Sequence, residues 1–253
     1  FACCSLARSM SCSAVFRVAP AFHKQARTYV QDMVEHGGNT EIDFDRKLVY
    51  PAEAKTGGYN FVQMPRGMID WHTHPSKCKN RNVCTIGLPY PADMINITIG
   101  AMNGTKGHII FSSEGQYVIQ VRPDVLEQLR NSPCFYLQFE SRVQEVFEEL
   151  HQKFVKMSLR RYRQYVKEWL VTAAKLGFLV SFFEADDPAE IELDFACDKR
   201  GREALPITAY RPDVHAQDCD LDQSQPIFRH RKYKSKTRKK SLATKSKRRK
   251  RKK

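Results

Sequence analysis

The chain has 253 residues, a length that fits one or two domains, and a formal net charge of +14. Residues 229–253 hold 16 of the 42 Lys and Arg residues and no acid, so elsewhere 26 basic residues face 28 acidic ones. This balance excludes a strongly basic folded domain. No apolar run approaches the roughly 18 residues of a membrane span, so we expect a soluble protein without a membrane partner.

We expect the folded core to begin near residue 21. Residues 1–20 are rich in Ser, Ala, Cys and Arg, and no acid precedes Asp32, a composition that is similar to an organelle transit peptide and also fits a fragment. We therefore place residues 1–20 outside the core, as a disordered segment. Between Ala21 and Glu35 apolar residues recur every three or four positions, which predicts an amphipathic helix ended by Gly37-Gly38.

Short alternating segments follow this helix and predict a meander of strands. They contain Ile42 and Phe44, Leu48 and Tyr50, Tyr59 to Met64, and Met68 to His72. An apolar run at 94–102 comes next, and two turns then separate it from segments 108–112 and 116–121. This pattern predicts a three-segment antiparallel sheet, unless the run at 94–102 is helical.

The second half of the chain has mainly helical spacing. Apolar residues across 139–175 predict one long helix, or two helices joined near Ser158, that packs across the sheet or binds a protein partner. Segments 178–183 and 191–195 predict a hairpin, and 201–228 a linker. The basic tail at 229–253 should be disordered, and it fits a nuclear localisation signal or a contact with nucleic acid.

The segment Asp70-Trp71-His72-Thr73-His74-Pro75 carries the strongest functional signal. Two histidines two positions apart on a strand project from the same face, so both imidazoles can bind one metal ion. With the carboxylate of Asp93 they would leave the fourth position of a tetrahedral zinc to water, as in catalytic sites. Amide hydrolysis also needs a general base, for which Glu35 is the candidate and Glu41 and Glu53 are alternatives.

Together these residues resemble the JAMM (MPN-plus, JAB-domain) metalloproteases. That family carries an upstream Glu followed by a nearby Gly, then His-Ser/Thr-His-Pro, then Ser-x-x-Asp. The matching residues here are Glu35-His36-Gly37-Gly38, His72-Thr73-His74-Pro75 and Tyr90-Pro91-Ala92-Asp93. The resemblance spans about residues 21–121. It implies a three-layer α/β MPN domain of the cytidine-deaminase-like type, with a mixed curved sheet, at 21–125, followed by a helical extension with a short hairpin at 126–200.

The resemblance also implies roles for individual residues. His72, His74 and Asp93 would bind Zn²⁺, and Glu35 would carry the proton to the leaving amine. The substrate would be an isopeptide or peptide bond, typically on ubiquitin or a ubiquitin-like protein, as in a deubiquitinase. The loop between His74 and Asp93 is longer than in the family, and Tyr90 replaces the serine that stabilises the oxyanion. Losing one oxyanion donor can cost about 100- to 1,000-fold in rate.

Other interpretations stay open at this point. The chain could be an MPN-type interaction module that docks a partner through 139–175, or a nucleic-acid-associated protein that acts through its tail. Cys78 and Cys84 are either plain loop residues or form a second metal site or a redox-active pair. We leave His108 and His151 out of the site as packed or surface histidines.

The tail indicates a nuclear protein, and without that signal we would expect a cytoplasmic one. The scattered cysteines suit a reducing compartment. A small catalytic unit with a basic tail would also suit a large DNA virus.

Overall fold

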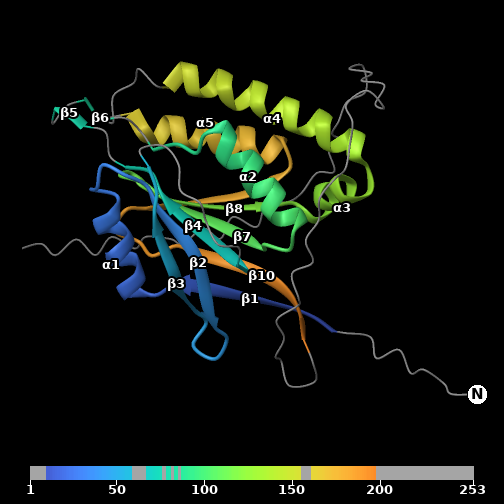
Figure 1. Cartoon of the computed structure of the whole chain (residues 1–253), viewed down its shortest axis with the longest axis horizontal. Helices are drawn as coiled ribbons and strands as arrows, with labels where there is room; N and C mark the ends of the chain where they lie inside the picture. The colour runs from blue at the N-terminus through green and yellow to red at the C-terminus, as the bar shows by residue number, and fades with distance from the viewer. Residues whose placement is uncertain are drawn as a thin grey trace, which may run out of the picture.

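The computed structural model describes residues 10–58, 67–75, 78–80, 83–84, 87–154 and 161–197, with the backbone alone at 10–12, 78–84 and 195–197. Within these ranges the chain forms a curled eight-stranded mixed sheet, a small two-stranded hairpin and five helices (Figure 1). The predicted α/β class is confirmed. The expected strand at Tyr59 to Met64, the linker and the basic tail lie outside the described residues.

Eight strands form the main sheet: β1 (Met10–Val18), β2 (His36–Asp43), β3 (Leu48–Thr56), β4 (Ile69–Thr73), β7 (Gly107–Phe111), β8 (Gly115–Val121), β9 (Phe178–Glu184) and β10 (Glu190–Cys197). Their order across the sheet is β10-β1-β3-β2-β4-β7-β8-β9. The pairs β1–β3 and β4–β7 are parallel, and the other neighbours are antiparallel. The separate hairpin consists of β5 (Cys78–Asn80) and β6 (Val83–Cys84).

Strand β1 lies in the segment that we expected to precede the core. It pairs along its length with β10 and, at Arg17 and Val18, with β3. Phe16 and Val18 are fully buried. The sheet therefore begins at residue 10, and the predicted start near residue 21 is too late. Composition could not show this, because the main partner of β1 is about 180 residues away in the sequence.

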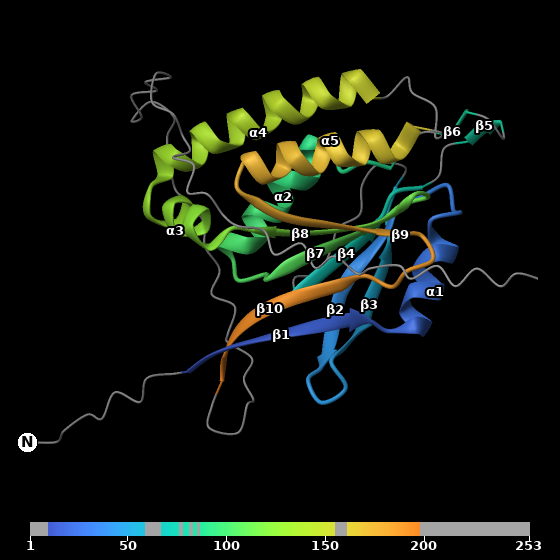
Figure 2. The ribbon, with the colours of Figure 1, turned by 180° about the vertical axis from the view of Figure 1, so that it is seen from behind.

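The strands β9 and β10 are consecutive in the sequence but pair with different neighbours. β9 extends the sheet beyond β8, whereas β10 joins the opposite edge beside β1 (Figure 2). The curl of the sheet brings β10 back toward β8, where Gln120 Nε2 donates a hydrogen bond to the backbone oxygen of Glu192 at 3.0 Å. The predicted hairpin is therefore wrong, and both strands belong to the same sheet as the site.

Helix α1 (Pro20–Tyr29) covers one face of the sheet, and Phe22 and Ala26 pack into the core there. The predicted helix continued to Glu35, but the chain leaves the helix earlier and enters β2 at His36. Gly38 consequently lies in a strand. A Cβ atom on it would lie 1.7 Å from the Glu53 carbonyl oxygen of β3, so this glycine permits a close approach of two strands.

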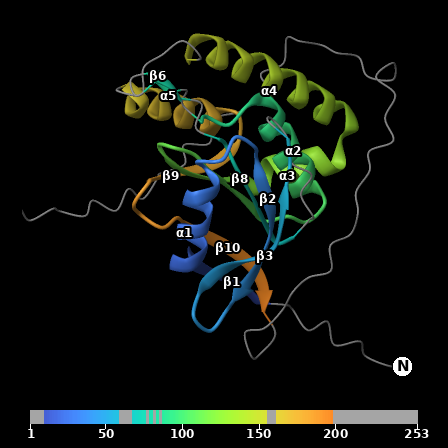
Figure 3. The same cartoon turned by 60° about the vertical axis from the view of Figure 1, so that its left-hand side comes forward.

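Four helices cover the other face (Figure 3): α2 (Pro91–Met102), α3 (Pro123–Asn131), α4 (Pro133–Phe154) and α5 (Tyr162–Lys175). The helical alternative for 94–102 is thus correct, because α2 connects the parallel strands β4 and β7. The expected antiparallel pairing of 108–112 with 116–121 is confirmed as β7 and β8. Two helices, α4 and α5, take the place of a single long one, which confirms the two-helix alternative for 139–175. Helix α3 was not predicted.

Helices α4 and α5 pack across the sheet with their apolar faces. Val143, Phe147, Trp169 and Ala173 are all buried there. The apolar residues of 139–175 are therefore buried against the sheet of the same chain. None of the helices in the described ranges combines the length and the apolar character that crossing a bilayer requires. Cys134, in the first turn of α4, is disulfide-bonded, which differs from the expected reduced state.

The side chains of strand β4 alternate between the core on one face of the sheet and the candidate site on the other. Ile69 and Trp71 point into the core beneath α1, where both are fully buried. Successive side chains of a strand point to opposite faces, so Asp70 and His72 face the helical layer that contains α2. The parallel pairing of β4 with β7 places the end of β4 beside the beginning of α2, where ligand sites commonly occur in α/β sheets.

Candidate metal centre

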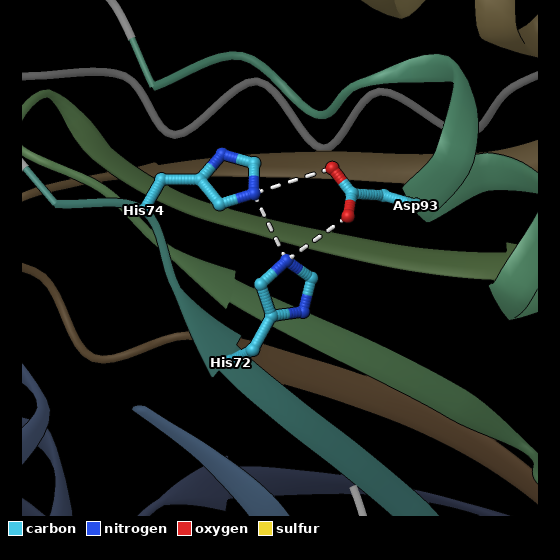
Figure 4. A group of neighbouring side chains, drawn as sticks. All are labelled: His72, His74 and Asp93. Atoms are coloured by element: carbon cyan, nitrogen blue, oxygen red, sulfur yellow. Dashed lines mark hydrogen bonds and ion pairs between the residues drawn. The ribbon is translucent and has the colours of Figure 1, made fainter. Parts of the chain in front are cut away.

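Three side chains from β4 and α2 meet on the face of the sheet that carries α2. His72 lies in β4, His74 follows directly after the strand, and Asp93 lies in the first turn of α2. Figure 4 shows the two imidazole rings and the carboxylate pointing toward one another. The two Nε2 atoms are 2.9 Å apart, and the Asp93 oxygens lie 3.4 Å from His72 Nε2 and 3.2 Å from His74 Nε2.

These separations fit a tetrahedral metal ion. With metal–ligand bonds of about 2.0–2.2 Å, two ligand atoms of a tetrahedral site lie about 3.3 Å apart. The observed separations of 2.9, 3.2 and 3.4 Å are close to that value. The side chains of both histidines are 4% exposed, whereas that of Asp93 is 17% exposed. The group can therefore hold a metal ion, and Asp93 is the most exposed of its three side chains.

Backbone and buried polar groups fix the ring of His74. Its backbone N–H donates to the carbonyl oxygen of Phe111 at 2.8 Å, which continues the pairing of β4 with β7 past the end of the strand. Its Nδ1 lies 3.0 Å from the carbonyl oxygen of Gly87. A carbonyl oxygen can only accept, so we assign the proton of the ring to Nδ1. The Nε2 atom is then left to face Asp93.

Glu114 in turn holds the loop that contains Gly87. The Gly87 N–H donates to Glu114 Oε2 at 3.1 Å, and the hydroxyl group of Tyr117 donates to Glu114 Oε1 at 2.8 Å. Glu114 and Tyr117 are both buried. Such outer contacts orient metal-binding imidazoles, and here they extend from His74 to the turn between β7 and β8.

Asp93 is also oriented by its surroundings. The backbone N–H of Tyr90, the residue before α2, donates to Asp93 Oδ2 at 2.6 Å. The carboxylate lies in the first helical turn, where the helix dipole favours a negative charge. Pro91 supports this geometry, because proline at the start of a helix has a suitable φ angle and no N–H group to satisfy.

The three groups shift one another's pKa values. Burial raises the pKa of Asp93, but His74 and His72 together lower it well below the ordinary value. Burial lowers the pKa of His74, but Asp93, with contributions from Glu35 and the Gly87 carbonyl, raises it overall. Burial keeps the pKa of His72 below the ordinary value despite Asp93. Without a metal, a proton shared among these three side chains is thus favoured on His74.

A cation between the three side chains would suit this arrangement. With the Nδ1 atoms engaged elsewhere, both Nε2 lone pairs and the carboxylate oxygens point into the same space. Lone pairs at these distances repel unless protons or a metal ion lie between them. The donor set of two neutral imidazoles and one carboxylate is typical of a metal site that keeps a fourth position open.

Glu35 lies beside the candidate ligand His74 rather than in a helix. Its backbone N–H donates to the oxygen of Gly58 at 2.9 Å, and its carbonyl oxygen accepts from the N–H of Gly57 at 2.8 Å. The next residue, His36, donates its N–H to Thr73 Oγ1 at 2.9 Å, between the two histidines. Glu35 is 6% exposed, and its charge acts on His74.

The rival carboxylates do not share this position. Glu41 in β2 and Glu53 in β3 are both exposed. Glu53 lies beside Lys55, at 3.7 Å, in the outer part of β3. Of the three candidates, Glu35 combines burial with an electrostatic effect on His74, and its role as the base stays a prediction.

Tyr90 forms an aromatic contact with the site on one side and with α4 on the other. Its ring centroid lies 5.2 Å from that of His74 and 4.7 Å from that of His151. The sequence predicts that His151 is a packed or surface histidine outside the site, yet α4 brings it next to Tyr90. Sequence reasoning could not find this neighbour, because it depends on how α4 crosses the sheet.

The sequence also predicts that His108 lies outside the site, but the structure places it in direct contact with a predicted ligand. Its Nε2 atom lies 2.7 Å from His72 Nδ1, and its side chain is buried. Burial, followed by the effect of His72, keeps the pKa of His108 well below the ordinary value, so its imidazole is neutral. Sequence reasoning missed it, because the contact depends on the parallel pairing of β4 with β7.

Cys78 and Cys84 face each other in the register of the β5–β6 hairpin, but their side chains lie outside the described residues. A second metal site or a redox-active pair at these two cysteines therefore stays a prediction.

Comparisons of this chain with protein-family models, with curated proteins and with solved structures found no match. The function is therefore argued from the residues of the site and from their geometry.

Proposed function

We propose that this protein is a zinc-dependent isopeptidase or peptidase of the JAMM type, with an MPN-like domain. The observation that carries the proposal is the convergence of His72, His74 and Asp93 with a buried Glu35 beside His74. This is the set that amide hydrolysis requires: a metal site with an open position and a carboxylate that can move a proton.

Zinc fits the donor set best. Two imidazole nitrogens and one carboxylate oxygen in a tetrahedral arrangement are typical ligands of catalytic zinc, whereas calcium and magnesium prefer oxygen ligands and higher coordination numbers. A bound zinc ion would supply Lewis acidity toward a carbonyl group and lower the pKa of water at the open position toward about 7.

The residues of the chain itself supply the other requirements. Glu35 would accept a proton from the attacking water and return it to the leaving amine. Its buried position favours this role, because the backbone bonds to Gly57 and Gly58 hold it in place. The Tyr90 hydroxyl is the candidate donor to the oxyanion, since its ring lies next to that of His74.

The substrate proposal is an isopeptide bond on ubiquitin or a ubiquitin-like protein. The decisive experiment measures zinc content and cleavage of di-ubiquitin on the full chain, for wild type and the variants Glu35→Gln, His74→Ala and Glu53→Gln. Wild type should hold about one zinc per chain and cleave the substrate. Glu35→Gln should keep zinc and lose cleavage, and His74→Ala should lose both.

Glu53→Gln is the matched control, because it removes an exposed carboxylate of the same kind from a strand near the site. It should keep both zinc and activity. Folded wild-type protein without zinc would contradict the metal centre. Zinc-loaded wild type that leaves di-ubiquitin intact would contradict the ubiquitin-directed activity, and cleavage by Glu35→Gln at the wild-type rate would contradict the role of Glu35.

A further inference from the structure

His108 lies behind His72, on the side away from Asp93. It belongs to β7, the strand parallel to β4, and points to the same face of the sheet as His72. The distance of 2.7 Å between His108 Nε2 and His72 Nδ1 is that of a short hydrogen bond. Both residues are nearly fully buried, at 2% and 3% exposure, so water does not compete for this contact.

The contact bears on which nitrogen of His72 carries the proton. His72 Nε2 faces His74 at 2.9 Å and Asp93 at 3.4 Å, and it can bind a metal only if its lone pair is free. A neutral imidazole has one N–H group, so the proton must then lie on Nδ1 and needs an acceptor there. The Nε2 atom of His108 is in the position of that acceptor.

Each of the two histidine ligands thus has a hydrogen-bond acceptor at its Nδ1 atom, but the two acceptors are chemically different. The Gly87 carbonyl oxygen accepts from His74 Nδ1 at 3.0 Å, and His108 takes the corresponding place for His72. A backbone carbonyl can only accept, whereas an imidazole accepts only in the appropriate tautomer. Hence His108 itself must carry its proton on Nδ1.

We propose that His108 is a positioning residue of the metal centre: it accepts the Nδ1–H of His72 and so fixes the tautomer and ring orientation that direct His72 Nε2 to the metal. This inference rests on the proposed metal centre but not on the proposed substrate. It predicts that metal affinity depends on a hydrogen-bond acceptor at position 108, beyond the packing of a buried side chain.

The test compares His108→Met, which is similar in size but lacks a strong acceptor, with His108→Gln, which offers a carbonyl oxygen. Zinc affinity of the full-length chain is measured by competition with a chelating dye at pH 7. The Met variant should bind zinc about 10- to 100-fold more weakly than wild type, the usual effect of removing an outer-shell partner. The Gln variant should recover most of that loss.

His23→Gln is the control, since it alters a histidine in α1 away from the metal ligands, and it should leave zinc affinity unchanged. Wild-type affinity in His108→Met would overturn the proposal. Equal weakening in folded Met and Gln variants would also overturn it, because packing rather than acceptance would then be responsible. Zinc binding without cleavage in wild type leaves the inference intact, which separates its failure from that of the proposed activity.

A second measurement does not depend on the variants folding. Nitrogen-15 NMR of the imidazole rings in zinc-loaded wild type reports the tautomer of each histidine. His108 should carry its proton on Nδ1 with Nε2 unprotonated. A proton on His108 Nε2 would exclude it as the acceptor and would overturn the proposal.

Discussion

At Gly87 the absence of a side chain matters as much as the polar groups of the main chain. Its carbonyl oxygen accepts from His74 Nδ1, and its N–H donates to Glu114. A Cβ atom here would lie 2.6 Å from the Cβ of Ser112 and 3.2 Å from that of His74. Any larger residue must therefore displace the loop that orients His74.

Gly87→Ala should accordingly weaken both the fold and the site. We expect a loss of about 1–3 kcal/mol in the free energy of unfolding, the usual range for overpacking, measured by urea titration. Zinc affinity should fall by about tenfold or more, because the acceptor of His74 moves.

Gly100→Ala is the matched control in α2. Its nearest neighbour, Thr105 Oγ1, would be 3.5 Å from the new Cβ, an ordinary contact. In a helix this change should stabilise the protein by about 0.5–1 kcal/mol and leave zinc affinity unchanged. Wild-type zinc affinity and stability in Gly87→Ala would show that the loop adapts and that its position is not critical.

At the scale of elements, the site depends on the unit formed by β4, α2 and β7. The candidate ligands lie in β4, directly after it, and in α2, and the parallel pairing of β4 with β7 brings these elements together. This unit is supported by the strands beyond it, including β1, which inserts between β10 and β3.

The contribution of β1 can be tested with two neighbouring side chains on opposite faces. Phe16 is fully buried and contacts the ring of Phe44 at 5.3 Å, whereas Val15 is 47% exposed. Phe16→Ala should cost about 3–5 kcal/mol in the free energy of unfolding. Val15→Ala should cost no more than about 1 kcal/mol. Equal, small losses in urea titrations would show that residues 10–18 do not belong to the folded sheet.

At the scale of the whole molecule, the sheet separates two hydrophobic clusters, one beneath α1 and one beneath α2 to α5. The candidate metal centre lies on the side of the larger helical layer. A metal ion bound there would connect the end of β4 to the start of α2 and so would stabilise the folded chain as a unit.

Removing zinc should therefore lower the midpoint of thermal unfolding. At a free zinc concentration 100 times the Kd, binding adds about 2.7 kcal/mol to the stability of the folded state. For a chain of this size that corresponds to a decrease of about 5–10 °C on chelation, measured by calorimetry. His74→Ala should show no such decrease, and the same decrease in that variant would place the stabilising zinc elsewhere.

Local patterns were enough to predict the α/β class, the two histidines on one face of a strand and the two apolar helices of the second half. Those features depend on periodicity and on side-chain chemistry within about twenty residues. The pattern at 94–102 was ambiguous, because a short apolar run suits a buried helix as well as a strand.

The sequence by itself thus determined the group His72, His74 and Asp93 as candidate ligands. Tertiary structure alone decided that β1 and β10 complete the sheet, that Glu35 rather than Glu41 or Glu53 lies at the site, and that His108 supports His72. These features depend on pairing between segments far apart in the chain. A single sequence carries no local signal for such pairing, because its free energy comes from burial and hydrogen bonds that exist only once the sheet has formed.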